Sequence, residues 1–132
     1  MPTVLTGVDH SMKLMREETF GPVLPVIPFE DENEAIALAN DSEFGLSAAV
    51  FAGSREEGEA VARKIRAGAV SINDAGLTVS VHDVEKNAFC LSGMGGSRMG
   101  DAGLLRFFRK QALMYQSAPA LPLDYFDESA AR

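Results

Sequence analysis

The chain has 132 residues, of which 46% are hydrophobic and 23% charged, and its formal charge is −7. This composition is typical of a globular domain, and the negative charge argues against nucleic-acid binding because it repels phosphate backbones. No apolar run approaches the ~18 residues that a membrane span needs, so we expect a cytoplasmic protein that does not enter a membrane.

The first predicted strand and helix follow one another between residues 23 and 45. Residues 23–29 are mostly β-branched or apolar and predict a strand, which its two prolines place at an edge or in irregular pairing. Asp31 is a predicted helix N-cap with Glu34 as its reciprocal partner, and an apolar face follows. The polar, turn-prone residues 40–45 predict the end of that helix.

A second strand, helix and third strand are predicted up to residue 72. Residues 46–51 are almost continuously apolar, as in a strand covered on both faces. Ser54 and Glu57 predict a capping box for a helix that Gly68 ends, and residues 69–72 predict the next strand. This β-α-β-α-β order favours an α/β fold, with a parallel sheet layered with helices.

The C-terminal third is less regular in sequence. Residues 74–100 lack clear periodicity and predict a long loop, with a short strand near Val79–Val81. Asp101 is predicted to cap a helix through Phe108, and residues 112–115 predict a final edge strand. We expect one domain over residues 1–116, followed by an acidic, flexible tail over residues 117–132.

Four ordered blocks are the most specific feature of the chain. Glu17–Val23 reads Glu-Glu-Thr-Phe-Gly-Pro-Val and follows a predicted strand and turn at residues 2–16. Residues 39–51 and 67–73 supply the other two blocks, and four blocks in order are far more specific than one short pattern. Together they resemble the aldehyde dehydrogenase family over nearly the whole chain. Residues 85–90 depart from that family's Pro-Phe-Gly-Gly-x-Lys segment.

The resemblance implies a cofactor and two residues that contact it. Glu18 matches the family residue that binds the nicotinamide ribose of NAD or NADP, and Phe20 matches the aromatic residue beside the nicotinamide. A carboxylate suits the ribose because its two oxygens can accept hydrogen bonds from the vicinal hydroxyls. Gly21 and Pro22 are expected to set a turn that points both side chains inward. The alternative interpretation is a solvated glutamate and a core phenylalanine.

The family reaction also needs a cysteine nucleophile and a dinucleotide-binding half, which precede this motif in the family, whereas 17 residues precede Glu18 here. We therefore expect the C-terminal part of an NAD(P)-dependent aldehyde dehydrogenase, with no catalytic residue of its own. We expect the isolated chain to be inactive and to bind NAD(P) negligibly, and to associate with an aldehyde dehydrogenase N-terminal portion or as a homo-oligomer.

The resemblance makes residues 112–116 a candidate oligomerisation strand that joins the sheet of a neighbouring subunit. An edge strand within the same subunit is an equally open interpretation. A different function is a stand-alone oligomerisation or regulatory module, which would dock on full-length relatives through this strand and an exposed sheet edge.

Cys90 is the single cysteine, which excludes an internal disulfide and fits a reducing compartment. It follows Glu18, whereas the family nucleophile precedes this motif, so a structural role is favoured. A small independent enzyme using Cys90 would need His10 or His82 as a base, and no spacing supports either. The histidines also lack metal-ligand spacing, so no metal site is predicted.

Overall fold

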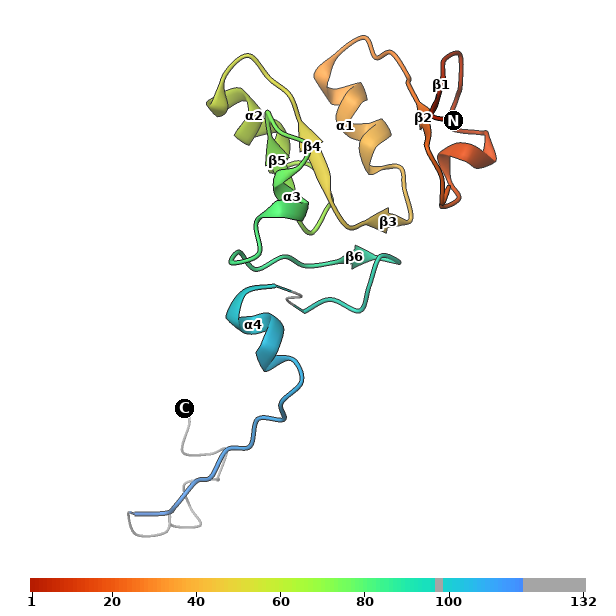
Figure 1. Cartoon of the computed structure of the whole chain (residues 1–132). Helices are drawn as coiled ribbons and strands as arrows, with labels where there is room; N and C mark the ends of the chain where they lie inside the picture. The colour runs from red at the N-terminus through yellow and green to blue at the C-terminus, as the bar shows by residue number, and fades with distance from the viewer. Residues whose placement is uncertain (97–98, 118–132) are drawn as a thin grey trace, which may run out of the picture.

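The structure, a computed structural model, describes residues 1–96 and 99–117 of the chain. Figure 1 shows α1 between the β1–β2 pair and the β4–β5 pair, with α4 and the residues after it extending away from this body. In chain order the elements are β1 (Thr3–Leu5), the 3-10 helix η1 (Lys13–Met15), β2 (Val23–Pro25), α1 (Glu32–Asn40), β3 (Phe44–Gly45), β4 (Ala48–Val50), α2 (Arg55–Ala62), β5 (Val70–Ile72), α3 (Leu77–Ser80), β6 (Phe89–Cys90) and α4 (Gly100–Leu105).

The strands pair two by two. β1 pairs in parallel with β2, and β4 pairs in parallel with β5, with Ala48 opposite Val70. β3 and β6 form an antiparallel pair with Phe44 opposite Cys90. The α/β class and its parallel pairing are therefore confirmed, while the described strands form three two-stranded sheets that do not join into one within this chain. The predicted strand over residues 46–51 is shorter than expected, since β4 covers Ala48–Val50.

The predicted starts of α1 and α2 are correct, but the predicted capping partner of Asp31 and the predicted end of α2 are not. The Ser54 hydroxyl accepts from the Glu57 N–H and the Glu57 carboxylate accepts from the Ser54 N–H, which completes the capping box of α2. Asp31 caps α1, but the Glu34 carboxylate accepts from the N–H of Glu30 at 2.6 Å, one residue before the predicted partner. α2 ends at Ala62, so Gly68 does not end it.

The predictions for residues 77–117 are corrected in three places. Val79 lies in α3 and not in a strand, because the Asp74 carboxylate accepts from the N–H groups of Gly76 and Leu77 and starts a helical turn there. α4 begins at Gly100 with Met99 as its N-cap, so Asp101 lies in the first turn and caps nothing.

α4 ends at Leu105, short of the predicted end at Phe108. Residues 112–117 form no strand in the single chain, so the edge strand predicted within the same subunit is absent there. Residues 118–132 of the predicted tail lie outside the described residues.

Gly45 and Gly68 allow three chain segments to cross closely. A Cβ atom on Gly68 would lie 2.0 Å from the carbonyl oxygen of Asn87, and one on Gly45 would lie 2.6 Å from that of Arg66. Backbone hydrogen bonds run from the Gly68 N–H to the Gly45 oxygen and from the Asn87 N–H to the Gly68 oxygen. Gly68 therefore serves a close backbone approach that places the β3–β6 pair beside the start of β5.

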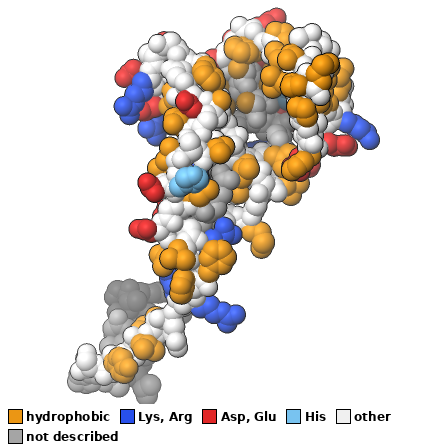
Figure 2. Space-filling model, in the orientation of Figure 1, with side chains coloured by type: hydrophobic (Ala, Val, Ile, Leu, Met, Phe, Trp, Pro, Cys, Tyr) orange, Lys and Arg blue, Asp and Glu red, His pale blue; other side chains and the backbone are white. Residues whose placement is uncertain are grey.

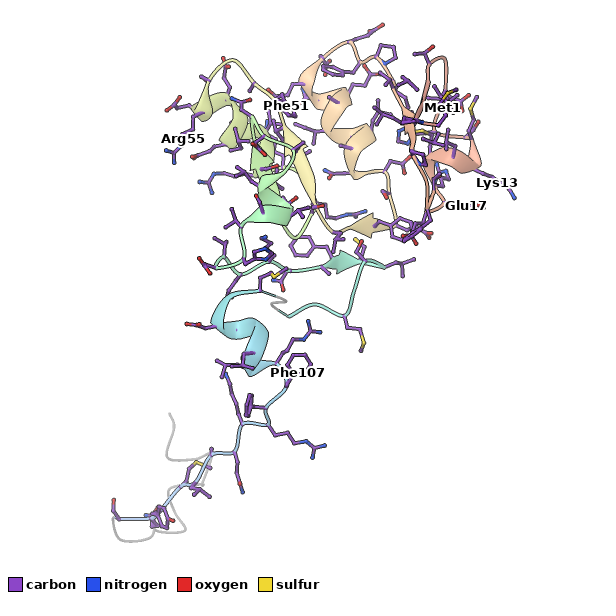
Figure 3. The ribbon with its side chains drawn as sticks, viewed as in Figure 1. Met1, Lys13, Glu17, Phe51, Arg55 and Phe107 are labelled. Carbon is purple, nitrogen blue, oxygen red and sulfur yellow. The ribbon has the colours of Figure 1, made fainter. Side chains whose placement is uncertain are left out.

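No apolar side chain is fully buried among the described residues. Ser71 and Lys86 are buried, whereas Phe107 is 81% exposed and its side chain projects from the chain in Figure 3. Figure 2 shows hydrophobic side chains at the surface of both the body and the narrow C-terminal part. Exposed apolar surface of this extent is typical of surfaces that another polypeptide covers.

Candidate functional site

The Glu17–Val23 segment connects η1 to β2 and is fixed at its C-terminal end. The N–H of Gly21 donates to the Thr19 carbonyl at 2.8 Å, and the N–H of Val23 donates to the Gly21 carbonyl at 2.9 Å. The N–H of Thr3 donates to the Pro22 carbonyl at 2.9 Å, and parallel pairing of β1 with β2 continues from there. The turn predicted at Gly21 and Pro22 is thus held against β1.

Glu18 and Phe20 lie on this segment, and both are exposed. Phe20 has 98% of its surface accessible, so the prediction that the turn points both side chains inward is wrong for this chain. The alternative of a core phenylalanine is wrong as well. The physical reason is that no other described part of the chain covers the segment, although both of its ends are anchored.

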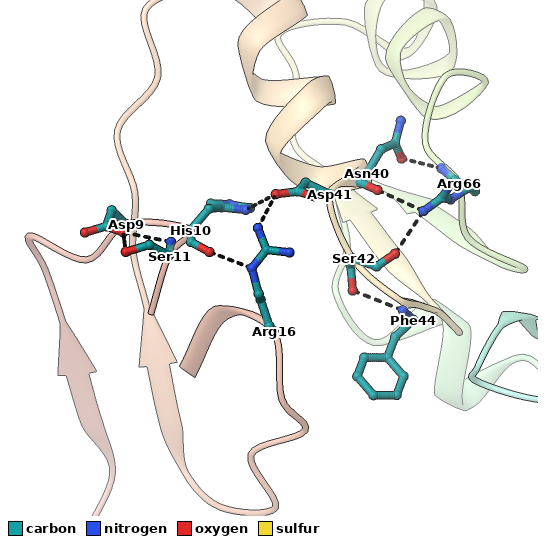
Figure 4. A network of polar contacts seen from close by, with 9 residues as sticks. All are labelled: Asp9, His10, Ser11, Arg16, Asn40, Asp41, Ser42, Phe44 and Arg66. Atoms are coloured by element: carbon teal, nitrogen blue, oxygen red, sulfur yellow. Dashed lines mark hydrogen bonds and ion pairs between the residues drawn. The ribbon is translucent and has the colours of Figure 1, made fainter. Parts of the chain in front are cut away.

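A polar network anchors the N-terminal end of the segment to the end of α1 (Figure 4). The Arg16 Nε donates to the His10 carbonyl at 2.9 Å, and the Arg16 guanidinium lies 3.4 Å from the Asp41 carboxylate. The Nδ1 atom of His10 lies 3.0 Å from the same carboxylate oxygen, and Asp41 is the C-cap of α1. These contacts of Arg16 and His10 with the end of α1 therefore position the residues just before Glu17.

The same network continues to the segment after α2. The Arg66 guanidinium donates to the carbonyls of Asn40 and Ser42, and the Asn40 side-chain oxygen accepts from the Arg66 N–H at 2.7 Å (Figure 4). The Asn40 amide group donates to the Lys64 carbonyl at 2.8 Å. The Asn40–Ser42 part of the sequence block over residues 39–51 thus has a structural role, which is to join α1 to the residues that lead into β5.

The pKa of Asp9 gives a test of this N-terminal arrangement. Hydrogen bonds from the Ser11 hydroxyl and the Ser11 N–H lower the pKa of Asp9 below its ordinary value of 3.8. Because the pKa of Asp9 is lower in the folded state, ionised Asp9 stabilises the fold fully above pH 3.8. This stabilisation is lost as pH falls through the folded-state pKa. We expect Ser11→Ala to raise the pKa of Asp9 towards 3.8 in an NMR titration, since the hydrogen bond from the Ser11 hydroxyl is the largest cause of the lowered pKa. An unchanged pKa would contradict this.

Cys90 has no histidine as a hydrogen-bond partner in the described part of the chain. It is exposed on β6 opposite Phe44, with a φ of 52°. No hydrogen bond joins Cys90 to His10 or His82 among the residues that the structure describes, and the His10 Nδ1 faces Asp41 instead.

Within residues 1–96 and 99–117, no cluster of metal-ligating side chains is present. No helix of that part is long and apolar enough to cross a membrane.

Lys86 is a buried cation that sequence reasoning missed. It is 4% exposed, and its ammonium group donates to the carbonyls of Thr78 (2.8 Å) and Val81 at the end of α3. It lines a cavity of about 530 Å³ together with residues 69–73 of the β5 segment and residues of α3. A lysine in a polar stretch gives no sequence signal of burial, because its partners are backbone carbonyls of an unpredicted helix.

Residues 1–113 match the model of the aldehyde dehydrogenase family. The solved structure of the PutA protein of Anabaena variabilis is 59% identical with a TM-score of 0.81, over 94% of this chain and 26% of that one. Betaine aldehyde dehydrogenase of Staphylococcus aureus, solved with NAD+, is 40% identical with a TM-score of 0.72, over 79% and 20%.

A protein of Mycolicibacterium smegmatis named as an NADP+-linked succinate-semialdehyde dehydrogenase is 42% identical over 113 residues, which are 85% of this chain and 22% of that protein. The chain therefore spans about a fifth to a quarter of the length of these relatives. The family model covers most of the chain, and the motif, the fold and these relatives agree with it. The chain belongs to the aldehyde dehydrogenase family.

Proposed function

We propose that this chain forms part of an NAD(P)-dependent aldehyde dehydrogenase, in which Glu18 and Phe20 contact the nicotinamide end of the cofactor. The observation that carries the proposal is that the Glu17–Val23 segment is anchored at both ends while these two side chains face outward. An anchored segment with outward side chains is suited to a ligand or polypeptide that lies outside this chain.

The geometry of the segment fits this cofactor end. Glu18 forms no ion pair with any described residue, so its carboxylate oxygens are available to the ribose hydroxyls. The exposed ring of Phe20 can pack beside a nicotinamide, and nothing lies within 4 Å of the place where a Cβ on Gly21 would be. Bound NAD(P) would accept a hydride when the complete enzyme oxidises an aldehyde to a carboxylate.

The isolated chain is proposed to be inactive and to bind NAD(P) negligibly. One carboxylate and one aromatic ring supply about 1–3 kcal/mol, whereas micromolar affinity needs about 8 kcal/mol. The remaining contacts and the nucleophile would come from an aldehyde dehydrogenase N-terminal portion. A cytoplasmic location is part of the proposal, because a single unpaired cysteine suits a reducing compartment.

The experiment compares the chain with a reconstituted complex. We expect calorimetry to show that the chain alone does not bind NAD+ or NADP+ saturably with a Kd below roughly 100 µM. A Kd above that value corresponds to a weak free energy of binding. The N-terminal portion of the Anabaena PutA protein is then added, with succinate semialdehyde and betaine aldehyde as probes. Only this complex is expected to form NAD(P)H.

Within the complex, Glu18→Ala is expected to lower NAD(P)H formation about 10- to 100-fold, since hydrogen bonds to a charged group contribute ~1.5–3 kcal/mol. Glu56→Ala is the matched control, because this exposed glutamate lies in the first turn of α2 and outside the motif. Activity of the isolated chain, or equal effects of the two substitutions, would contradict the proposal.

A second candidate function is a stand-alone oligomerisation or regulatory module. The observation that favours it is the exposure of Leu113, Met114 and Tyr115, which lie in the candidate oligomerisation strand over residues 112–116. The proposed division is then one domain over residues 1–116 and a tail from residue 117. Light scattering after size-exclusion chromatography separates the two candidates: a monodisperse dimer or tetramer favours the module, and aggregates or an expanded monomer favour the first proposal.

A further inference from the structure

Glu18 directly follows a short turn that is built around η1. The N–H groups of Arg16 and Glu17 both donate to the Lys13 carbonyl, at 3.0 and 2.8 Å, and the Lys13 ammonium lies 3.9 Å from the Glu17 carboxylate. These local bonds set the shape of the turn as far as Glu17. They do not by themselves fix where the turn lies relative to the rest of the chain.

The Arg16 side chain fastens this turn to the end of α1 (Figure 4). Its Nε donates to the His10 carbonyl at 2.9 Å, and its Nη2 lies 3.4 Å from a carboxylate oxygen of Asp41. The His10 Nδ1 lies 3.0 Å from the same oxygen. One guanidinium therefore joins the loop before η1 to a helix end that lies 25 residues further along the chain.

The end of α1 is a firm point of attachment for this contact. The Asp41 N–H closes the last turn of the helix as its C-cap. The side-chain oxygen of Asn40 accepts from the Arg66 N–H at 2.7 Å, and the Arg66 guanidinium donates to the carbonyls of Asn40 and Ser42. A turn that is held by Asp41 is therefore held relative to both α1 and the segment that leads into β5.

The span that carries Glu18 is too short to absorb a shift of the turn. Its two ends are the hydrogen-bonded amides of Glu17 and Gly21, each with a donor–acceptor distance of 2.8 Å. Only residues 18–20 lie between these amides. Because a binding group must be held within roughly 0.5 Å of its productive position, even a small shift of the turn would misplace the Glu18 carboxylate.

We propose that Arg16 is a positioning residue for Glu18. Its contacts with His10 and Asp41 fix the point from which the Glu18 carboxylate reaches the ribose hydroxyls, and its guanidinium does not touch the cofactor. The inference rests on the proposed function, because the position of Glu18 matters only if Glu18 binds the ribose. It adds a residue outside the Glu17–Val23 motif whose loss weakens cofactor binding.

The exposure of the Arg16–Asp41 pair separates this role from a role in stability. The two side chains are 55% and 49% exposed, and ion pairs of this exposure contribute little to the free energy of unfolding. We therefore expect Arg16→Gln to leave the urea midpoint of the chain unchanged. Amide exchange at Glu17 in the chain alone is expected to become about threefold faster or more, because the turn is no longer fastened to α1.

The cofactor measurement uses the full chain combined with the N-terminal portion of the Anabaena PutA protein. Arg16→Gln is expected to raise KM for NAD(P)+ about three- to tenfold, while KM for succinate semialdehyde changes less than about twofold. Arg16→Lys keeps a cation opposite Asp41 and is expected to hold KM for NAD(P)+ within about twofold of the parent chain. Arg63→Gln is the matched control and is expected to change neither KM, because it removes the same charge from an exposed ion pair with Glu59 at the end of α2.

An unchanged KM for NAD(P)+ in Arg16→Gln, in a complex where Glu18→Ala lowers NAD(P)H formation, would overturn the inference and leave the proposed function standing. An equal increase in Arg63→Gln would overturn it as well, because the effect would then be one of net charge. A complex in which Glu18→Ala has no effect would count against the proposed function and the inference together. Unchanged exchange at Glu17 in Arg16→Gln would overturn the inference on the chain alone, without any complex.

Discussion

Replacing Gly68 with alanine is expected to lower the free energy of unfolding by about 3 kcal/mol or more, because a new Cβ would meet backbone atoms that no rotamer change can move. The added carbon would lie 2.0 Å from the Asn87 carbonyl oxygen and 2.3 Å from its carbonyl carbon. Relief requires the segment before β6 to move away from the start of β5. Such a movement also lengthens the hydrogen bond from the Asn87 N–H to the Gly68 carbonyl, now 3.2 Å.

Urea unfolding followed by circular dichroism, together with amide exchange at Asn87, measures this effect. Gly21→Ala is the matched control, since nothing lies within 4 Å of a Cβ there and its φ is not in the left-handed region. That substitution is expected to change the unfolding free energy by less than about 1 kcal/mol, through the unfolded chain alone. Similar losses in both variants would show that the crossing at Gly68 is not tight.

Replacing Lys86 with methionine is expected to lower the free energy of unfolding by about 3 kcal/mol. The ammonium group of this buried lysine bonds the carbonyls of Thr78 and Val81, and methionine fills a similar volume without a donor. Two part-buried acceptors would then lose a charged partner, and each unsatisfied group costs about 1–3 kcal/mol. Exchange of the Val81 amide, which donates to the Leu77 carbonyl, is expected to become faster as α3 loosens.

Lys64→Met is the control for Lys86→Met because it removes the same charge at an exposed position. The Lys64 ammonium lies 2.8 Å from the Glu32 carboxylate, and both side chains are about half exposed. Solvent-exposed ion pairs contribute about 0–1 kcal/mol, so this variant should be nearly as stable as the parent chain. Equal losses from the two lysine substitutions would place the effect in net charge and not in the two carbonyls of α3.

The local structure of residues 31–72 follows from short sequence separations. Asp31 and Ser54 cap the helices as predicted, because each bonds an N–H three residues away. The strand predicted over residues 69–72 is present as β5 over Val70–Ile72, where two β-branched residues alternate with Ser71. The family itself is identified by the Glu17–Val23 motif and the blocks around it, which a sequence displays in full.

The roles of Gly68 and Lys86 depend on contacts that no local pattern contains. Gly68 is placed where a helix could end, but α2 ends at Ala62 and the glycine instead meets the Asn87 backbone from a segment read as loop. Lys86 is buried because α3 forms where the sequence predicted a strand, and its partners are backbone carbonyls that carry no residue identity.

Sequence alone determined the α/β class, the family and the two candidate cofactor contacts, because these depend on residue types at fixed spacings along the chain. Only the tertiary structure decided that Glu18 and Phe20 face outward, that the strands pair two by two, and that Lys86 is buried beside a cavity. These features depend on which distant segments approach one another, and that is set by backbone contacts and by surfaces that this chain leaves uncovered.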